Sequence, residues 1–229
     1  MILTANRFLV VGGALESSSG PSIEVIDLVN PSLTCNFFWE LYTRTSIVGG
    51  LLGNTPVVCG GTWVSRCDIF GQSPVLMTQG RSRAASVVIN ATTMWIMGGR
   101  WYDSYLSSTE FITLDNSESG PSFPHPMWDL CAVKFNESQI YVIGGEGNGQ
   151  YSNEVYVYNP LDNFSYKYHS TMNYRRSNPG CAIMNDGDSM VIVVAGGYGR
   201  LSSSYSSNGE LDSSEILDPS QGQWNIGKK

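Results

Sequence analysis

The sequence predicts an all-β fold made of five copies of one small antiparallel sheet. An apolar run that ends in two glycines occurs five times, and the segments 85–99 and 131–145 around two of these runs align without a gap. No segment of ten or more residues has its apolar residues at a helical spacing. Self-similarity at a period of about 20 to 50 residues is typical of repeat architectures, so the repeat decides the fold class.

Each repeat carries the signals of four short strands, here called A to D. Strands A and B form a hairpin that ends at the diglycine, strand C follows a polar loop, and strand D is a variable stretch that often contains an aromatic residue. β-Branched and aromatic residues between Gly, Asn, Asp and Pro are typical of antiparallel strands. We therefore predict one domain, 1–229, with approximate repeats 1–43, 44–79, 80–126, 127–172 and 173–229.

The four-stranded unit, with a diglycine closing strand B and a Tyr or Trp in the outer strands, resembles the kelch repeat of β-propellers. The resemblance covers nearly the whole chain, although the second repeat is short and lacks the outer Trp. It implies a β-propeller of five four-stranded antiparallel kelch-like blades, or a fragment of a six- or seven-bladed ring. The chain enters its first repeat within strand A and stops in strand D of the fifth, which favours the fragment.

The paired glycines are expected to be structural. A side chain at the end of strand B would collide where blades converge, and the following turn needs a positive φ, which glycine adopts without steric cost. A phosphate-binding loop is not expected, because such loops precede a helix. The paired glycines are Gly12, Gly13, Gly60, Gly61, Gly98, Gly99, Gly144, Gly145, Gly196 and Gly197.

Arginines and aromatic residues concentrate in the B–C and D–A loops, which an up-and-down order of strands places at the same end of each blade. Arg, Tyr and Trp dominate binding hot spots, because they bury large areas and make directional polar contacts. The structural alternative is that these arginines cap blade ends and these aromatic rings pack on neighbouring blades. The predicted partner-binding face consists of Arg81, Arg83, Arg100, Trp101, Tyr102, Tyr151, Arg175, Arg176, Tyr198 and Arg200.

Two functions fit this face. Kelch-like relatives commonly bind partner proteins through these loops, so the resemblance implies a non-catalytic protein–protein interaction module, whose unknown partner would offer an acidic or aromatic segment. The alternative is a carbohydrate or small-molecule binding protein or enzyme that uses Arg100, Trp101 and Tyr102 at the mouth of the central channel.

The net charge limits the other partners. Twenty acidic against thirteen basic residues give a charge of −7, which repels phosphate backbones and anionic lipid headgroups. Nucleic acid is therefore not an expected partner, and the longest apolar run, 190–197, is too short for membrane insertion. Residues 1–13 lack the features of a signal peptide, so a cytoplasmic location is slightly favoured over an extracellular one.

The sequence predicts no enzyme, no cofactor and no metal site. His125 and His169 lie in a D–A loop and near the end of an outer strand, so they are not expected to converge on copper, as histidines do in kelch-like oxidases. The segment 186–189 fits a hairpin turn better than a calcium loop. Serine-hydrolase and zinc-protease motifs are absent. Carboxylates with no sign of pairing for glycoside chemistry are Glu110, Asp115, Glu118 and Glu154.

Turns at the opposite end of the blades match the N-glycosylation pattern Asn-x-Ser/Thr. These triplets begin at Asn90, Asn136 and Asn163, but about three are expected by chance in a chain of this composition. Asn also favours such turns for its own backbone reasons.

The five cysteines cannot all pair with one another. Cys131 and Cys181 occupy the same strand A position in adjacent repeats, and we expect them to be buried and unreactive. The sequence does not decide whether Cys59 and Cys67 form a disulfide across two strands of one blade.

Overall fold

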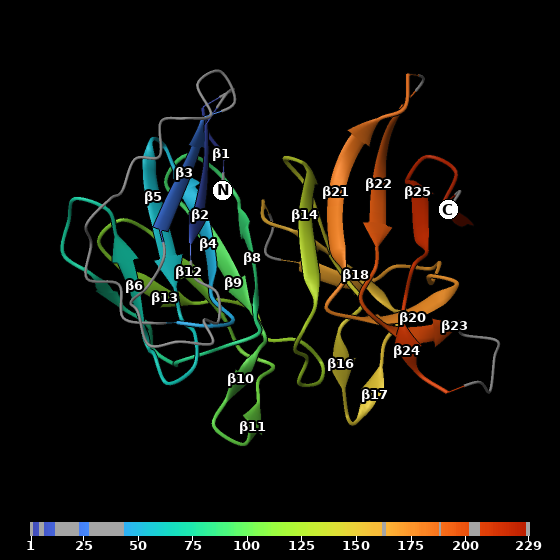
Figure 1. Ribbon diagram of the computed structural model, residues 1–229, viewed down its shortest axis with the longest axis horizontal. Coiled ribbons are helices and arrows are strands. Elements are labelled where there is room, and N and C mark those ends of the chain that lie inside the picture. The colour runs from blue at the N-terminus through green and yellow to red at the C-terminus, as the bar shows by residue number, and fades with distance from the viewer. Residues whose placement is uncertain are drawn as a thin grey trace. The chain divides into compact units, whose positions relative to one another are not determined.

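The described part of the chain consists of strands and turns. The computed structural model describes residues 2–4, 7–11, 23–27, 44–161, 164–187, 189–201 and 207–227. In these ranges the strands form small antiparallel sheets and there is no helix, which confirms the all-β prediction (Figure 1). The same ranges contain no helix long and apolar enough to cross a membrane.

The main sheets follow the five predicted repeats, and their strands pair in chain order. The first sheet contains β1 (Ile2–Thr4), β2 (Arg7–Val11) and β3 (Ile23–Asp27). The second contains β4 (Val48–Leu52), β5 (Thr55–Cys59), β6 (Arg66–Ile69) and β7 (Val75–Leu76). The third contains β8 (Ala85–Val88), β9 (Met94–Met97), β12 (Thr109–Ile112) and β13 (Ser117–Ser119).

The last two main sheets have the same order. The fourth contains β14 (Cys131–Asn136), β15 (Gln139–Ile143), β18 (Val155–Asn159) and β19 (Phe164–Lys167). The fifth contains β21 (Gly180–Asn185), β22 (Met190–Ala195), β25 (Ser214–Asp218) and β26 (Gln223–Ile226). Each of the four-stranded sheets is therefore the A to D meander that the sequence predicts.

Small sheets lie in the loops between the main ones. Their strands are β10 (Arg100–Trp101), β11 (Ser104–Tyr105), β16 (Glu146–Gly147), β17 (Gln150–Tyr151), β20 (Tyr174–Ser177), β23 (Tyr198–Leu201) and β24 (Gly209–Glu210). They arise because a B–C loop either pairs with itself or pairs with the preceding D–A loop.

The chain divides into two compact units, and strand A packs beside strand A within each. Unit 1 comprises residues 1–104 and 108–120, and unit 2 comprises residues 105–107 and 121–229. In unit 1 β4 lies beside β8, and in unit 2 β14 lies beside β21 (Figure 1). Within each unit, the two repeats that contain these strands therefore pack with their first strands together.

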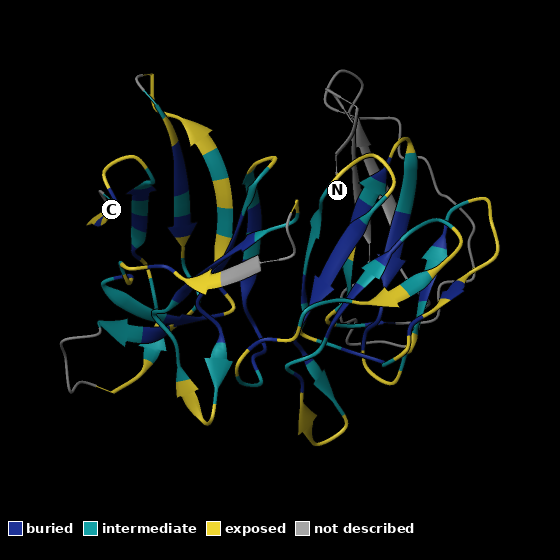
Figure 2. Cartoon of the chain, turned by 180° about the vertical axis from the view of Figure 1, so that it is seen from behind, coloured by how far each residue is buried: buried dark blue, intermediate teal, exposed yellow. Residues whose placement is uncertain are grey.

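Each unit has its own apolar core between these packed sheets. Figure 2 shows buried residues along the middle strands of the sheets. In β5 and β9 the core residues alternate along the strand, as expected for side chains that point to one face of a sheet. The unit 1 core includes Leu52, Val57, Cys59, Ile69, Met94, Ile96 and Ile112. The unit 2 core includes Val133, Tyr141, Ile143, Val157, Ile192, Val194 and Leu217.

The diglycines lie where neighbouring repeats approach each other closely. Gly60 and Gly61 have φ angles of 67° and 106°, and the other described pairs have positive φ as well. A Cβ at Gly60 would lie 2.2 Å from the carbonyl oxygen of Arg81, and one at Gly144 would lie 2.8 Å from that of Arg176. Both carbonyls belong to the next repeat, so a side chain at either glycine would force the two repeats apart. Gly12 and Gly13 lie outside the described residues.

Two of these next-repeat arginines are completely buried. The Arg81 Nη1 donates hydrogen bonds to the carbonyls of Gly98 and Ser108 at 2.8 and 2.9 Å, and its Nη2 lies 2.7 Å from Glu110 Oε1. Both side chains of the Arg81–Glu110 pair are at most 1% exposed. The guanidinium therefore ties the D–A loop to strands B and C of its own sheet.

Arg176 repeats this arrangement in unit 2. Its Nη1 donates to the carbonyls of Gly196 and Ser213 at 2.8 and 2.9 Å, and its Nε lies 3.1 Å from Glu215 Oε1. We call the Arg81–Glu110 and Arg176–Glu215 pairs the buried clamps. Their glutamates stand at the same place in strand C.

The glutamate of each buried clamp also binds the loop backbone that precedes its arginine. Glu110 accepts hydrogen bonds from the N–H groups of Thr78 and Gln79, at 2.7 and 3.1 Å. Glu215 accepts from the N–H groups of Asn173 and Tyr174, at 2.5 and 3.0 Å. Each carboxylate therefore fixes the course of the D–A loop three and two residues before the arginine.

Arg81 and Arg176 consequently do not reach the surface. The prediction that they belong to a partner-binding face is wrong, because each guanidinium is buried and donates its hydrogen bonds to its own sheet. The sequence places these arginines in D–A loops but does not show whether their side chains point inward or outward. For Arg81 and Arg176 the structural alternative holds, in which the arginine caps the end of its own sheet.

The clamp varies in the other repeats. In the second, Arg44 Nη2 lies 2.5 Å from Asp68 Oδ2, where Asp68 takes the strand C position. In the fourth, Met127 takes the place of the arginine and is fully buried. The clamp carboxylate is replaced there as well, because Tyr156 takes its position in β18. Glu154, just before β18, accepts hydrogen bonds from Lys167 and Tyr156.

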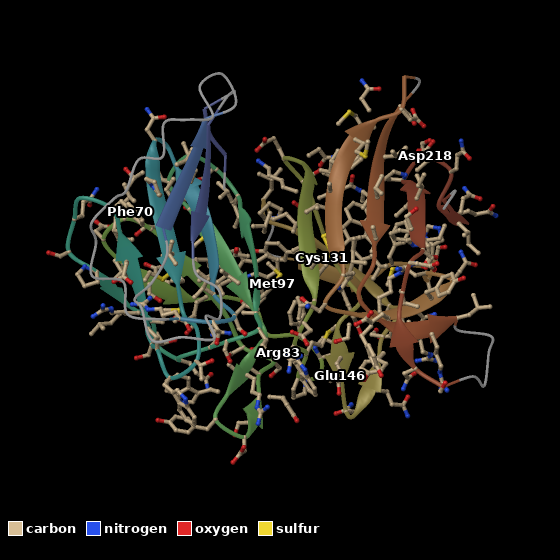
Figure 3. The ribbon with its side chains drawn as sticks, in the orientation of Figure 1. Phe70, Arg83, Met97, Cys131, Glu146 and Asp218 are labelled. Carbon is tan, nitrogen blue, oxygen red and sulfur yellow. A yellow bond between two sulfur atoms is a disulfide. The ribbon has the colours of Figure 1, made fainter. Side chains whose placement is uncertain are left out.

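Two disulfides add covalent links within the units. Cys59–Cys67 joins β5 to β6, and Cys131–Cys181 joins β14 to β21 (Figure 3). The expectation that Cys131 and Cys181 are unreactive is therefore wrong, because the two thiols have formed a bond. Their equivalent positions on packed A strands place their Cα atoms 6.1 Å apart, within the usual range for a disulfide.

Truncating the Arg81 side chain should strongly destabilise unit 1. Arg81→Ala leaves Glu110 charged and buried without its cation, which costs about 3 to 5 kcal/mol of unfolding free energy. Arg83→Ala, a change at an exposed residue two positions away, should cost less than about 1 kcal/mol. Urea unfolding of the two variants measures the difference, and equal losses would contradict the clamp.

The same pair predicts an acid-dependent loss of stability. Burial alone would raise the pKa of Glu110, but hydrogen bonds from Arg81 and Ser117 and the charge of Arg81 outweigh it and lower the pKa. Its stabilising contribution is therefore complete above the unfolded-state pKa of about 4.3 and is lost as the pH falls through the lower folded-state value. Unfolding free energies measured from pH 6 downward should fall less steeply for Glu110→Gln than for Glu118→Gln, the exposed control. Equal slopes would rule out this contribution.

Candidate functional site

The D–A and B–C loops meet through short backbone pairings at one end of each sheet. Ser82 pairs with Arg100, Trp128 with Glu146, and Ser177 with Tyr198. In each pair the second residue directly follows a diglycine. Ser82 and Ser177 in turn directly follow the clamp arginines. The buried clamps and the glycines thus position the loops that the sequence assigns to a binding face.

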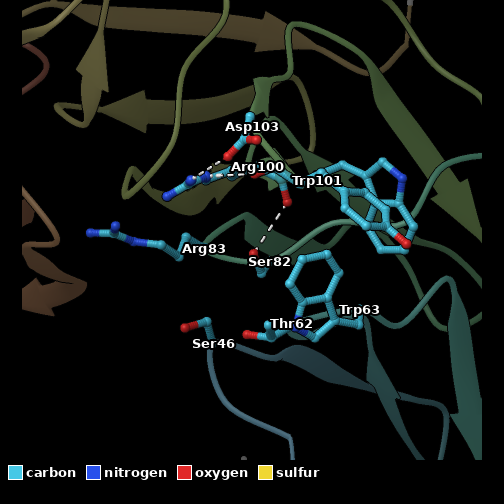
Figure 4. Close-up of a pocket in the computed structure, with 9 residues that line it drawn as sticks. Ser46, Thr62, Trp63, Ser82, Arg83, Arg100, Trp101 and Asp103 are labelled. Atoms are coloured by element: carbon cyan, nitrogen blue, oxygen red, sulfur yellow. Dashed lines mark hydrogen bonds and ion pairs between the residues drawn. The ribbon is translucent and has the colours of Figure 1, made fainter.

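In unit 1 these loops enclose a cleft of about 290 Å³ (Figure 4). Arg83 and Arg100 lie on one side of the cleft, Trp63 and Trp101 on the other, and Ser82 lies between them. The full lining is Ser46, Thr62, Trp63, Ser82, Arg83, Arg100, Trp101, Tyr102 and Asp103. We call this the unit 1 cleft.

Hydrogen bonds position the two arginines of the unit 1 cleft, through the side chain of Arg100 and through the backbone of Arg83. Arg100 Nε donates to the carbonyl of Tyr102 at 2.7 Å, and its Nη2 lies 3.3 Å from Asp103 Oδ1. The N–H of Arg83 donates to the carbonyl of Ser46 at 3.1 Å, and Arg83 has a φ of 54°. Both guanidinium groups extend toward the same side of the cleft (Figure 4).

Three aromatic rings form the opposite side. Tyr102 contacts Trp63 and Trp101 edge-on, with ring centroids 4.4 and 4.8 Å apart. Trp63 and Tyr102 are 63% and 57% exposed, which is unusual for such large rings. Trp101 lies over Gly80, where a Cβ would come within 2.1 Å of its ring. The rings therefore form an exposed apolar platform on a fixed base.

Sequence reasoning missed Trp63. A usable signal existed, because Trp63 stands two residues after Gly61 and Trp101 stands two residues after Gly99. The loop after the second diglycine is short, yet its aromatic residue reaches the same cleft. The other lining residues that the sequence did not predict are Ser46, Thr62, Ser82 and Asp103.

Unit 2 gathers the remaining predicted residues on its own loops. Tyr151 and Tyr198 contact edge-on at 5.6 Å, and Arg175 Nη1 donates to the carbonyl of Tyr151 at 3.2 Å. Arg175 stands directly opposite Arg200 in the β20–β23 pair. A further exposed ring, Tyr105, stacks on the buried Trp128 with centroids 3.7 Å apart.

Each carboxylate that the sequence offered as a catalytic candidate accepts hydrogen bonds from neighbouring side chains. Glu110 belongs to a buried clamp, and Asp115 and Glu118 accept hydrogen bonds from Thr113 and Asn116. Burial raises the pKa of Glu154, but its bonds to Lys167 and Tyr156 outweigh this and lower it.

The histidines have separate neighbours in unit 2. His125 contacts the ring of Tyr156, whereas His169 contacts that of Tyr168. Within the described ranges, no three His, Cys, Asp or Glu side chains gather in a way that could hold a metal ion.

A comparison with protein families identifies a Kelch motif at residues 130–163. The matched segment contains β14, β15 and β18 and the diglycine Gly144–Gly145, so it coincides with the fourth repeat. The resemblance to the kelch repeat of β-propellers is thereby confirmed. A comparison with curated protein sequences gives no match.

The base of the aromatic platform can be tested at Gly80. In Gly80→Ala the new Cβ would overlap the Trp101 ring, so the ring must shift at a cost of about 1 to 3 kcal/mol. Gly209→Ala is the control, because nothing lies within 4 Å of its Cβ position. Thermal or urea unfolding compares the two, and a neutral Gly80→Ala would show that the ring is not held against this glycine.

Proposed function

We propose that the chain is a non-catalytic protein-interaction module of the kelch type. In this proposal its five sheets are propeller blades, and the B–C and D–A loops form the partner-binding face. The unit 1 cleft is the observation that carries the proposal, because it joins exposed aromatic rings to two arginines at the end of the sheets where loops meet. The Kelch motif supports it, since kelch domains generally mediate protein interactions.

The chemistry of the unit 1 cleft suits an acidic segment that also carries an aromatic or apolar side chain. Two arginines and Asp103 give the lining a charge of 2 − 1 = +1, within a chain of net charge −7. A guanidinium can bind a carboxylate through two parallel hydrogen bonds. The adjacent rings offer apolar area with few rotatable bonds, which keeps the entropy cost of binding low.

The non-catalytic part of the proposal is supported by how the polar groups are used. Glu110 and Glu215 serve the buried clamps, and Glu154 accepts hydrogen bonds from Lys167 and Tyr156. The arginines of the unit 1 cleft lie beside aromatic rings and a single carboxylate, Asp103. This set suits recognition of a bound group.

The exposure of Trp63 and Tyr102 also favours a second candidate. A sugar ring can stack on an exposed aromatic face while arginine and aspartate bind its hydroxyls. A carbohydrate or small-molecule binding protein therefore stays the alternative, and the same cleft would serve it.

Charge reversal in the unit 1 cleft tests the proposal. Proteins captured by the immobilised chain should be lost from the double variant Arg83→Glu, Arg100→Glu, with affinity for an identified partner falling about tenfold or more. Lys134→Glu, a charge reversal in β14 outside the cleft, should retain them. Unchanged capture by the double variant would contradict this face, and binding to a glycan array instead of proteins would favour the alternative.

A further inference from the structure

Two exposed hairpin turns between strands A and B have the same sequence pattern and the same geometry. The turn between β8 and β9 contains Asn90-Ala91-Thr92, and the turn between β14 and β15 contains Asn136-Glu137-Ser138. Both match the acceptor pattern of N-glycosylation. The third such triplet begins at Asn163, which lies outside the described residues.

The third residue of each triplet holds the asparagine side chain. Thr92 donates hydrogen bonds to Asn90 Oδ1 from its N–H at 2.9 Å and from its hydroxyl at 3.0 Å. Ser138 binds Asn136 Oδ1 in the same way, at 2.9 and 3.1 Å. Hydrogen bonds to the oxygen polarise the carboxamide. At Asn136 the nitrogen, Nδ2, also donates to Gln139 Oε1 at 2.8 Å, and this exposed bond must break before the nitrogen can react. Because this geometry spans only three residues, the segment can adopt it before the chain has folded.

A glycan at either turn is compatible with the fold. Asn90 and Asn136 are both exposed, so attached sugars would displace no buried group. In unit 1, β9 (Met94–Met97) lies between Asn90 and Arg100 and corresponds to about 13 Å of extended chain. A glycan at Asn90 therefore lies at the opposite end of its sheet from the unit 1 cleft and leaves the cleft accessible.

The disulfides indicate the compartment in which this reaction occurs. Cys59, Cys67 and Cys131 are buried in the packed sheets, and Cys181 is partly buried against the same core as Cys131. Disulfides form and persist in oxidising environments such as the secretory pathway and are rare in the cytosol. This observation outweighs the slight preference for the cytoplasm that the sequence alone gave.

We propose that Asn90 and Asn136 are N-glycosylation sites and that the chain folds in a secretory compartment. Asn Nδ2 forms a bond to C1 of a polyprenyl-diphosphate-linked oligosaccharide. The bond from C1 to the diphosphate oxygen breaks, Nδ2 loses a proton, and the polyprenyl diphosphate leaves. The triplet supplies the acceptor, and the oligosaccharyltransferase of the compartment supplies the catalyst.

The test is expression of the full chain behind a cleavable signal sequence in a eukaryotic secretory host. Peptide-N-glycosidase treatment in heavy-oxygen water converts each glycosylated asparagine to labelled aspartate, which peptide mass spectrometry locates. The label is expected at positions 90 and 136 and not at Asn116, an exposed turn asparagine without the pattern. Secreted, folded protein with no label at 90 and 136 would overturn the proposal.

Variants of Thr92 separate the acceptor pattern from effects on folding. Thr92→Ser keeps the hydroxyl and should keep the label at position 90. Thr92→Val keeps the shape but removes the hydroxyl, so the label should disappear at 90 and remain at 136 in the same molecule. Labelling at 90 in Thr92→Val would contradict the proposed acceptor.

The compartment is tested on protein from its native source. Thiol alkylation before and after reduction should find Cys59, Cys67, Cys131 and Cys181 reactive only after reduction. Free thiols at these four positions in the native protein would overturn the secretory assignment.

Discussion

The fold depends on a buried guanidinium and carboxylate that join the loop before strand A to strand C of the same sheet. Arg81 and Arg176 each bind the first glycine of their own repeat through the side chain. Their backbone carbonyls accept hydrogen bonds from the second glycine of the preceding repeat, Gly61 and Gly145, at 2.9 and 2.8 Å. One residue therefore connects two neighbouring sheets, and a Cβ at the first glycine of the preceding repeat, Gly60 or Gly144, would collide with its carbonyl oxygen.

The candidate site follows from this constraint. The residues after the clamp arginines, Ser82 and Ser177, pair with the residues after the diglycines, so each B–C loop starts from a fixed point. Arg100 begins one such loop and contributes to the unit 1 cleft. In the proposed function, the buried ionic frame beneath the unit 1 cleft leaves little of the cleft to order on binding, which favours affinity.

The strands and the diglycine turns could be predicted from the sequence because they depend on local pattern and on repetition. The direction of the arginines could not. Arg81 and Arg83 stand two residues apart in one loop, yet one is buried and the other exposed, and only the position of Glu110 in the folded sheet decides which. The Cys131–Cys181 bridge could not be predicted from the sequence, because the repeat shows that the two cysteines are equivalent but not that their A strands, β14 and β21, lie side by side.

A double-mutant cycle on the second buried clamp tests the central claim most directly. Unfolding free energies of Arg176→Ala, Glu215→Ala and the double variant give the coupling between the two side chains. Because either single change leaves a buried charge without its partner, the double variant should be more stable than the sum of the single losses by about 2 kcal/mol or more. Additive losses would show that the two groups act independently, and the clamp would not be the interaction that organises the repeats.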